Sequence, residues 1–420
     1  MITASAIEEK LRSIVGVRYL RVATTSDAVA GVQPKFVAEP ATEQELAALL
    51  SSANEARIAV IPRGGGTKLA WGNPPKRADL VVSTARLNRV LEHAWADLTV
   101  SVEAGCTLRT LQHKLAEHGQ RLALDGLWPG RATIGGILST NDSGVLRLRF
   151  GALRDLVIGV TLALPDGTLA SSGGKVVKNV AGYDLPKLAT GALGTLGVVT
   201  RAIFRLHPLP HSSRTLSFAA AHSSDAERHI LAIQDSRLAH TALQLRGDSG
   251  GQIFADILFE ATEAGLAAQE SQLRTVVGES EVERSGGELW GAREGLWSSP
   301  SQNAVVVKLS VLPSAIAKTV RLIEESANPR NVRFQYVLQA TGLGALRLEG
   351  ESSSLASVVE RVRSELEASE ASLVVLHRPA GLESLDAWGS SGDAVALMRS
   401  VKQQLDPMKT LNPGRFVGGI

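Results

Sequence analysis

The residues whose types and spacing best suit chemistry are Arg63-Gly64-Gly65-Gly66-Thr67-Lys68, which directly follow the apolar run 58–61 and Pro62. Three consecutive glycines permit positive φ angles and carry no Cβ, so a ligand can lie against bare main-chain N–H groups. The two flanking cations and the Thr67 hydroxyl suit an anion, above all a diphosphate. A glycine-rich hinge between two solvated cations is the alternative.

Two better-known phosphate-binding patterns do not fit this stretch. The dinucleotide pattern G-x-G-x-x-G would need a glycine where Leu69 stands. The P-loop string G-x-x-x-x-G-K-[ST] occurs nowhere in the chain. We therefore expect neither a Rossmann nor a P-loop nucleotide site.

Two further glycine-dense stretches follow, 128–144 and 191–199. In the first, Gly135 and Gly136 permit close backbone approach, and short polar side chains could bond to phosphate oxygens and heterocycle edges. These side chains are Thr133, Ser139, Asn141 and Ser143. In the second, glycines break any helix just before a strand, so the main chain could approach an adenine. An exposed turn-rich loop and a tight strand connection are the respective alternatives.

Length and composition limit the class of protein. A chain of 420 residues with 44% hydrophobic and 20% charged residues predicts a globular protein of two domains or more. A formal net charge of +2 without a basic block argues against a nucleic-acid partner. The single cysteine, Cys106, excludes an internal disulfide framework and a cysteine-ligated iron–sulfur cluster, and it suits a reducing, cytoplasmic location. No apolar run reaches the roughly 20 residues of a membrane helix, so we expect no direct membrane insertion.

The first part of the chain predicts alternating helices and strands around the glycine loop. Thr42 and Glu45 form a capping-box pattern before a helix of about three turns, and a strand at 58–61 then delivers the loop. Strands are expected at 79–83 and 98–102, followed by a helix capped by Thr107 and closed by Gly119.

The second part predicts two β-α-β-β-α-β units in tandem. The first has strands at 215–219, 241–246, 252–259 and 279–283, and helices at 224–238, with Ser224 and Glu227 as a capping box, and 262–277. The second has strands at 305–311, 332–338, 345–349 and 373–377, with amphipathic helices beginning near Ile316 and Leu355. We expect one antiparallel sheet with its helices on a single face, and a final helix at 393–405.

The three glycine stretches resemble, in order and in register, the FAD-binding domain of the vanillyl-alcohol oxidase and p-cresol methylhydroxylase (PCMH) family, which includes D-lactate dehydrogenases and glycolate oxidase flavoprotein subunits. The matching strings are Ile61-Pro-Arg-Gly-Gly-Gly-Thr67, Pro129-x-x-x-Thr-Ile-Gly-Gly136, Asn141-x-x-Gly144, Phe150-Gly-x-x-x-Asp155, Lys178-Asn-x-x-Gly-Tyr-Asp-Leu185, Gly191-x-x-Gly-Thr-Leu-Gly197 and Asp406-Pro-x-x-x-x-Asn-Pro-Gly414. The resemblance implies an α+β, two-lobed protein. It would have a PCMH-type FAD-binding domain at 1–211, a cap at 212–385, and a segment at 386–420 that returns to the first domain.

The resemblance also implies which residues hold FAD. They are Pro62, Arg63, Gly64, Gly65, Gly66, Thr67, Lys68, Pro129, Thr133, Ile134, Gly135, Gly136, Ser139, Asn141, Gly144, Gly194, Gly197, Val199 and Asn412. Relatives with a covalently bound flavin usually have a histidine just after the triple glycine. Thr67 stands at that place here, so we expect non-covalent FAD.

The catalytic residues are less well marked. In related D-2-hydroxy-acid dehydrogenases the cap carries H-x-G-D-G-N-x-H, commonly with a divalent metal, whereas this chain reads Leu376-His377-Arg378-Pro379-Ala380-Gly381. We therefore expect no catalytic metal. His377 and Arg378 are the candidates for proton acceptor and carboxylate clamp, and an ordinary pair at a strand end is the alternative.

Within the family the chain most resembles the FAD-binding E subunit of glycolate oxidase (glycolate dehydrogenase). That resemblance implies a small 2-hydroxy acid as substrate, a sister flavoprotein subunit and an iron–sulfur subunit as partners, and contact with the inner membrane only through them. A stand-alone flavin dehydrogenase and a flavin-free structural subunit are the other two hypotheses.

Overall fold

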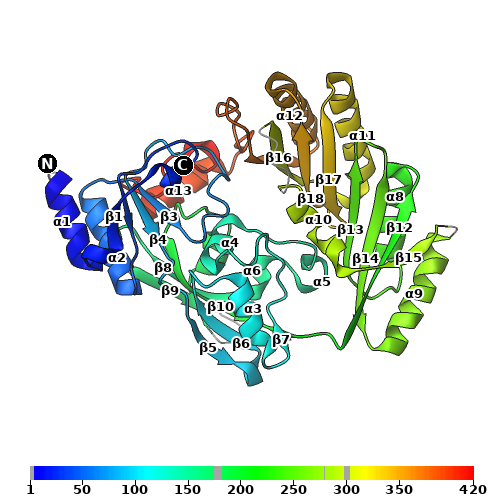
Figure 1. The fold of residues 1–420 in the computed structure, drawn as a ribbon, viewed down its shortest axis with the longest axis horizontal. Helices are drawn as coiled ribbons and strands as arrows, with labels where there is room; N and C mark the ends of the chain where they lie inside the picture. Colours follow the sequence, from blue (N-terminus) through cyan, green and yellow to red (C-terminus); the bar gives the residue numbers. More distant parts are fainter. Residues whose placement is uncertain (1–3, 175–181, 279, 298–302) are drawn as a thin grey trace. The chain divides into compact units, whose positions relative to one another are not determined.

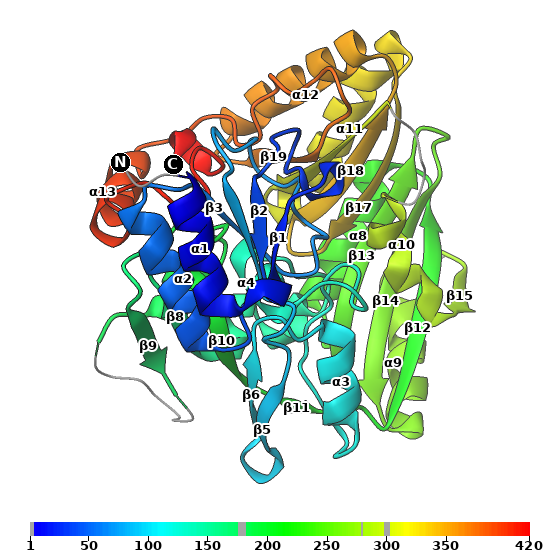
Figure 2. The ribbon, with the colours of Figure 1, turned by 60° about the vertical axis from the view of Figure 1, so that its left-hand side comes forward.

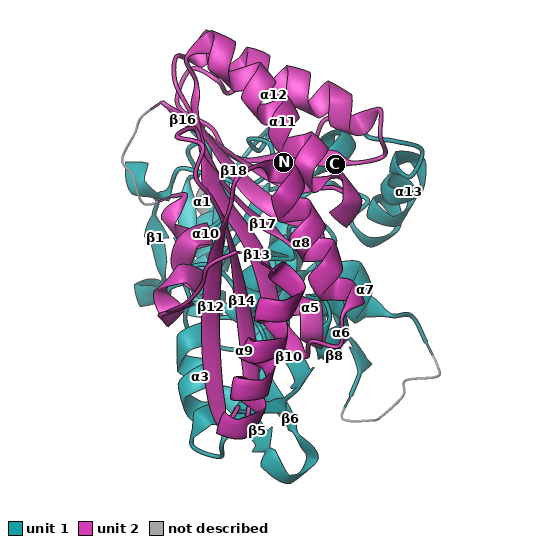
Figure 3. Cartoon of the chain, turned by 90° about the vertical axis from the view of Figure 1, so that its right-hand side faces the viewer, with its two compact units in different colours: residues 1–143, 151–209, 391–420 teal, residues 144–150, 210–390 magenta. Residues whose placement is uncertain are grey.

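The computed structural model describes residues 4–174, 182–278, 280–297 and 303–420. The chain divides into two compact units, drawn in two colours in Figure 3. Unit 1 comprises residues 1–143, 151–209 and 391–420, and unit 2 comprises residues 144–150 and 210–390. Within the described residues, no helix has both the length and the apolar character needed to cross a membrane.

Unit 1 begins with a four-stranded sheet of order β1-β2-β4-β3. Its strands are β1 (Leu20–Val22), β2 (Phe36–Ala38), β3 (Val60–Arg63) and β4 (Leu80–Ser83), and only β1 runs antiparallel to its neighbour. Helices α1 (Ala4–Val15) and α2 (Glu43–Glu55) lie side by side (Figure 2) and bury Leu11, Leu46 and Leu50 with Leu80 and Val82 of the sheet. The predicted helix–strand–loop order before Gly64 is therefore confirmed.

A second, antiparallel sheet completes unit 1, with order β5-β6-β10-β8-β9 (Figure 1). Its strands are β5 (Val90–Ala94), β6 (Thr99–Glu103), β8 (Val157–Ala163), β9 (Leu169–Gly173) and β10 (Val198–Arg205). The helices are α3 (Leu108–Ala116), α4 (Ile134–Thr140), α6 (Leu153–Leu156), α7 (Leu185–Ala189) and α13 (Val395–Leu405), and β7 (Gln120–Arg121) pairs with β11 (His207–Pro208). The glycine-rich start of α4 was not predicted to be helical.

Unit 2 is built on one eight-stranded antiparallel sheet of order β15-β12-β14-β13-β17-β18-β16-β19. The strands are β12 (Ser212–Ala220), β13 (His240–Asp248), β14 (Ile253–Ala261), β15 (Val282–Ser285), β16 (Ala304–Ser310), β17 (Arg333–Gln339), β18 (Leu343–Glu349) and β19 (Ser372–His377). Helices α8 (Ser223–Asp235), α9 (Glu263–Val277), α11 (Ile316–Ala327) and α12 (Ser352–Glu367) lie on one face (Figure 3), and the core between them includes Phe218, Ile257, Val307 and Val359. The two predicted β-α-β-β-α-β units are confirmed.

The remaining elements of the described residues are α5 (Arg147–Phe150), α10 (Ala292–Gly295) and seven 3₁₀ helices. The 3₁₀ helices are η1 (Val17–Tyr19), η2 (Thr25–Asp27), η3 (Trp95–Asp97), η4 (Gly287–Gly291), η5 (Pro313–Ala315), η6 (Asn328–Arg330) and η7 (Val417–Gly419).

Two local predictions need correction. The capping box at Ser224 and Glu227 is wrong, because His222 precedes the first helical residue of α8 and the Glu227 carboxylate accepts a hydrogen bond from the N–H of Ala317 at 2.7 Å. The Glu227 carboxylate therefore caps the start of α11 and does not cap α8, the helix that contains it. Gly119 does not close α3, which ends at Ala116.

In unit 2, three arginines surround Glu270 of α9. Its carboxylate accepts hydrogen bonds from Arg284 at 2.9 Å, Arg274 at 3.0 Å and Arg214 at 3.0 Å. These guanidinium groups, Arg284 first, lower the pKa of Glu270 from 4.5 to about 2.

We predict that Glu270→Gln lowers the free energy of unfolding by about 1 kcal/mol at pH 7, since Arg274 and Arg284 are largely exposed to water. The folded-state pKa lies below the unfolded value, so this contribution is present above pH 4.5 and is lost as the pH falls toward 2. Urea denaturation at several pH values measures it. A stability difference that stays constant on acidification would contradict this account.

Candidate functional site

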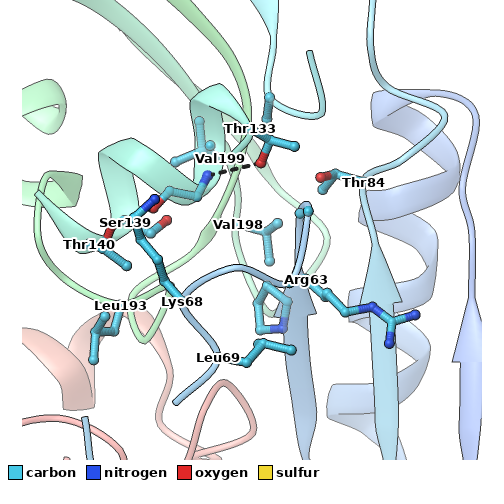
Figure 4. A pocket seen from close by; sticks show the side chains of 18 of the residues that line it. Arg63, Lys68, Leu69, Thr84, Thr133, Ser139, Thr140, Leu193, Val198 and Val199 are labelled. Carbon is cyan, nitrogen blue, oxygen red and sulfur yellow. Dashed lines mark hydrogen bonds between the residues drawn. The ribbon is translucent and has the colours of Figure 1, made fainter. Parts of the chain in front are cut away.

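A pocket in unit 1 brings together the three glycine stretches that lie far apart in the sequence (Figure 4). The empty space within it, open solvent at its mouth included, is about 690 Å³. Of the residues expected to hold FAD, it is lined by Pro62, Arg63, Gly64, Gly65, Gly66, Thr67, Lys68, Thr133, Gly135, Gly136, Ser139, Gly194, Val199 and Asn412. The expected convergence of the three stretches is present in the fold.

The loop 64–67 leaves the carboxyl end of β3, where Thr84 donates its N–H to the carbonyl of Arg63 at 2.9 Å. Among the described residues, nothing accepts a hydrogen bond from the main-chain N–H groups of Gly64, Gly65, Gly66 or Thr67. Gly65 and Gly66 are exposed, and Gly66 has a φ of 72°. Successive N–H groups of this kind form a concave anion-binding surface.

The glycines at 64 and 65 are required by packing against the second stretch, not by room for a ligand. A Cβ on Gly64 would overlap Oγ1 of Thr133, and a Cβ on Gly65 would overlap the carbonyl oxygen of Arg131. Gly136 differs, because Oγ1 of Thr133, at 3.2 Å, is the one neighbour within 4 Å that its Cβ would meet among the described residues. A side chain at Gly65 would therefore point into the backbone of Arg131, whereas Gly136 is the position that faces open space.

The second stretch forms α4 against the β6–β10 sheet. Thr133 caps the helix, its hydroxyl accepting the N–H of Gly136 at 3.3 Å. Gly135 donates its N–H to the carbonyl of Ala104 at 2.8 Å, and its missing Cβ would lie 2.8 Å from that of Ala104. Gly135 thus permits close packing of α4 on the chain after β6, which places Ser139 and Thr140 in the pocket wall.

The third stretch is held by α4 and by the C-terminal segment. Leu193 donates its N–H to the carbonyl of Ser139 at 2.8 Å, and the Asn412 side chain donates to the carbonyl of Leu193 at 2.5 Å. Leu193 and Gly194 have φ angles of 50° and 66°, which turn the chain sharply before β10. The C-terminal segment also lies along β3, since Val60 donates to Thr410 and Asn412 donates to Val60, at 2.8 and 3.0 Å.

Two buried cations anchor this C-terminal segment. Lys402 of α13 donates to Asp406 at 2.5 Å, to the carbonyl of Thr195 at 2.7 Å and to the carbonyl of Leu411 at 3.0 Å. Arg415 donates to the carbonyls of Leu69 and Trp71 at 2.6 and 2.7 Å, and burial lowers its pKa to about 10. Arg415 also lines the pocket.

The two cations that flank the glycine loop are both paired within the chain. Arg63 lies 2.8 Å from the buried carboxylate of Asp27, and Lys68 lies 3.1 Å from Asp142. Hydrogen bonds from Arg21 and then Arg63 hold the pKa of Asp27 well below its usual range, so this partner stays ionised. Figure 4 shows Arg63 and Lys68 extending in opposite directions from the loop. Arg63 and Lys68 are therefore not solvated, as the alternative of a glycine-rich hinge would require.

Five expected residues do not line the pocket: Pro129, Ile134, Asn141, Gly144 and Gly197. Ile134 is buried in α4, and Gly144 belongs to unit 2. Asn141 ends α4 with a φ of 48°, and no described residue donates a hydrogen bond to its buried Oδ1. The start of the string Lys178-Asn-x-x-Gly-Tyr-Asp-Leu185 lies outside the described residues.

The lining also contains residues that the sequence did not suggest. They are Leu69, Thr84, Ala104, Thr140, Leu193, Val198 and Arg415. Arg415 directly follows the Asn412-Pro-Gly414 motif, which was a usable signal. Thr84 and Ala104 are brought to the pocket only by sheet pairing.

The candidate catalytic residues, His377 and Arg378, lie in unit 2 at the end of β19. Leu373 and Val375 face the core, so strict alternation would place His377 there too. A bulge at Leu376 instead pairs His377 with Val306, which also pairs with Arg347. His377 therefore lies on the face of the sheet opposite the four helices.

The charges around His377 and Arg378 affect the protonation of His377. Burial lowers the pKa of His377, and the positive charges of Arg347 and Arg378 lower it further, so the imidazole is neutral at pH 7. The guanidinium of Arg378 donates a short hydrogen bond to the carbonyl of Leu385. Lys308, between the core residues Val307 and Leu309, projects from the same face as His377.

The fold and pocket define a class of flavoprotein, and comparisons with known proteins support this. Residues 34–173 match the model of an FAD binding domain, and residues 388–416 match that of the FAD linked oxidases' C-terminal domain. p-Cresol methylhydroxylase has the same fold, with a TM-score of 0.81 at 13% identity over 99% of this chain and 97% of that chain.

Among relatives, the chain is 29% identical to D-2-hydroxyglutarate dehydrogenase of Xanthomonas citri pv. viticola over 91% of this chain and 89% of that protein. It is 36% identical to glycolate oxidase subunit GlcD of Bacillus subtilis over 44% of this chain and 39% of that protein.

The chain carries an FAD binding domain with the PCMH-type fold, and it is an FAD-dependent oxidoreductase. The pocket fits this cofactor, because the unused N–H groups of loop 64–67 provide donors for a diphosphate.

We predict that Gly136→Val abolishes FAD retention without unfolding the protein, because its side chain would enter the pocket beside Thr133. Flavin content after gel filtration and the melting temperature of the apoprotein measure the two effects. Gly65→Ala is the matched control, since its Cβ must displace the backbone of Arg131 and should lower the melting temperature as well. Full flavin content in Gly136→Val would refute this role of the pocket.

Proposed function

We propose that this chain is the FAD-carrying subunit of a complex that oxidises glycolate, or a similarly small 2-hydroxy acid, to the 2-oxo acid. The observation that carries the proposal is the convergence of three glycine stretches in one pocket, in a chain related along most of its length to a 2-hydroxy-acid dehydrogenase. The FAD-site residues named above as lining the pocket would hold the cofactor without a covalent bond. Bound FAD would supply the hydride acceptor.

The protein must supply a proton acceptor for the substrate hydroxyl, and we assign this role to His377. Its imidazole is half-buried, and burial together with Arg347 and Arg378 lowers its pKa, which favours the neutral form that accepts a proton. The bulge at Leu376 supports the assignment, since bulges often re-aim a side chain beside an active site.

A cation must hold the substrate carboxylate. Arg378, the residue the sequence suggested, remains our first candidate, although its bond to the Leu385 carbonyl occupies one of its donors. Lys308 and Arg347 lie on the same face of the sheet as His377 and are the further candidates that the fold adds. Comparison of Arg378→Met with Lys308→Met would separate them through the KM for the 2-hydroxy acid.

The partner assignment rests on sequence and on one relative. The chain has one cysteine and so cannot ligate an iron–sulfur cluster through cysteines, and the matched Bacillus subtilis protein is named as a subunit. A sister flavoprotein and an iron–sulfur subunit would therefore carry electrons onward. We propose a cytoplasmic location, with any contact with the inner membrane made through these partners.

A stand-alone D-2-hydroxyglutarate or D-lactate dehydrogenase is the second candidate. It is favoured by the 91% coverage of this chain in the match to D-2-hydroxyglutarate dehydrogenase. Dye reduction with glycolate, D-lactate and D-2-hydroxyglutarate, by the isolated chain and by the co-expressed complex, separates the two. Full activity of the isolated chain would refute the subunit assignment.

We predict that His377→Gln lowers kcat/KM by about 10²–10⁴-fold while the flavin content stays unchanged, as expected for loss of a general base. Because the pKa of His377 is lowered from 6.5, activity should fall with acidification only below about pH 6.5, where the imidazole becomes protonated. The variant should lack this acid limb. An unchanged pH profile in His377→Gln would exclude His377 as the base.

A further inference from the structure

A buried ion pair lies in the wall of the FAD pocket. Lys68 directly follows the loop 64–67, its side chain is 4% exposed, and its ammonium lies 3.1 Å from a carboxylate oxygen of Asp142, which is 1% exposed. Lys68 lines the pocket, whereas Asp142 does not. The ammonium itself is fully buried, so it can act on a ligand in the pocket only through its charge, and the Asp142 carboxylate beside it offsets part of that charge.

Asp142 is fixed by its own surroundings. It follows Asn141, where α4 ends, and its carboxylate accepts the N–H of Leu127 at 2.8 Å. It therefore ties the chain at 126–127 to the end of α4 while it faces Lys68. Removal of its charge need not move this carboxylate-sized group, because an amide oxygen can still accept the N–H of Leu127.

Two tryptophans enclose the ammonium of Lys68. Its Nζ lies 5.7 Å from the ring centre of Trp71 and 5.4 Å from that of Trp128. Indole faces attract cations, and their bulk keeps water away, so the charge is weakly screened. A charge held in this way acts more strongly on a nearby anion than a solvated lysine would.

We propose that Lys68 supplies the buried positive charge that acts, together with the N–H groups of loop 64–67, on the diphosphate of FAD, and that Asp142 sets how strongly it acts. In the apoprotein Asp142 balances the ammonium. When FAD binds, its diphosphate and the Asp142 carboxylate both interact with the Lys68 ammonium. The carboxylate therefore weakens the attraction between Lys68 and the diphosphate and limits the affinity for FAD. Asp142 is thus a positioning residue, and the inference rests on FAD being the cofactor.

The test compares the FAD dissociation constant of the apoprotein in four forms, measured by quenching of flavin fluorescence. We expect Lys68→Met to raise the dissociation constant at least tenfold, because the positive charge of Lys68 then no longer offsets the buried Asp142 carboxylate near the diphosphate. We expect Asp142→Asn to lower it severalfold, because the Asp142 carboxylate then no longer offsets the positive charge of Lys68. A purely structural contact would weaken binding in both variants.

The double variant, Lys68→Met with Asp142→Asn, is the control for loss of FAD binding that is caused by misfolding. It removes both buried charges and should melt closer to the wild-type temperature than either single variant, yet its dissociation constant should stay above that of the wild type. An increase in the dissociation constant in Asp142→Asn, or a wild-type value in the double variant, would overturn the proposal. Wild-type protein that binds FAD but oxidises no 2-hydroxy acid would refute the proposed function and leave this inference standing.

Discussion

The structure of the candidate site depends on four main-chain N–H groups that the described residues of the chain leave unused. Loop 64–67 can keep them exposed only because it is held from both sides. β3 fixes its start, and close packing of Gly64 and Gly65 on Thr133 and Arg131 fixes its direction. The glycines thus serve the ligand indirectly, because the absence of their side chains lets two loops pack tightly enough to form one wall.

Buried charges then join distant segments around this loop. Lys402 and Arg415 connect the C-terminal segment with the third glycine stretch and with the chain after Lys68 through main-chain carbonyls. Such bonds are costly to leave unmade in a buried setting, so they specify one arrangement of segments that are hundreds of residues apart in sequence. The pocket is therefore a product of the whole of unit 1, including residues 391–420.

The family resemblance predicted the cofactor site, whereas hydrophobic periodicity predicted most of the helices and strands. Periodicity predicted the strands and helices of unit 2 because each helix buries a continuous apolar face, as in α11 and α12. It missed α4, since two glycines inside seven residues argue against a helix and only packing on Ala104 offsets their low propensity. It also missed the bonding partner of Glu227, because a side chain that reaches another helix leaves no local pattern.

The sequence by itself determined the glycine stretches and their order, and their resemblance to PCMH-type flavoproteins implied FAD. It also determined that the histidine motif of related dehydrogenases is missing. Only the tertiary structure decided that Arg63 and Lys68 are paired with Asp27 and Asp142, that Gly136 and not Gly65 faces open space, and that a bulge turns His377 away from the core. The physical reason is that residue types and spacing record what a segment can do locally. Partners, burial and side-chain direction arise only when distant segments meet.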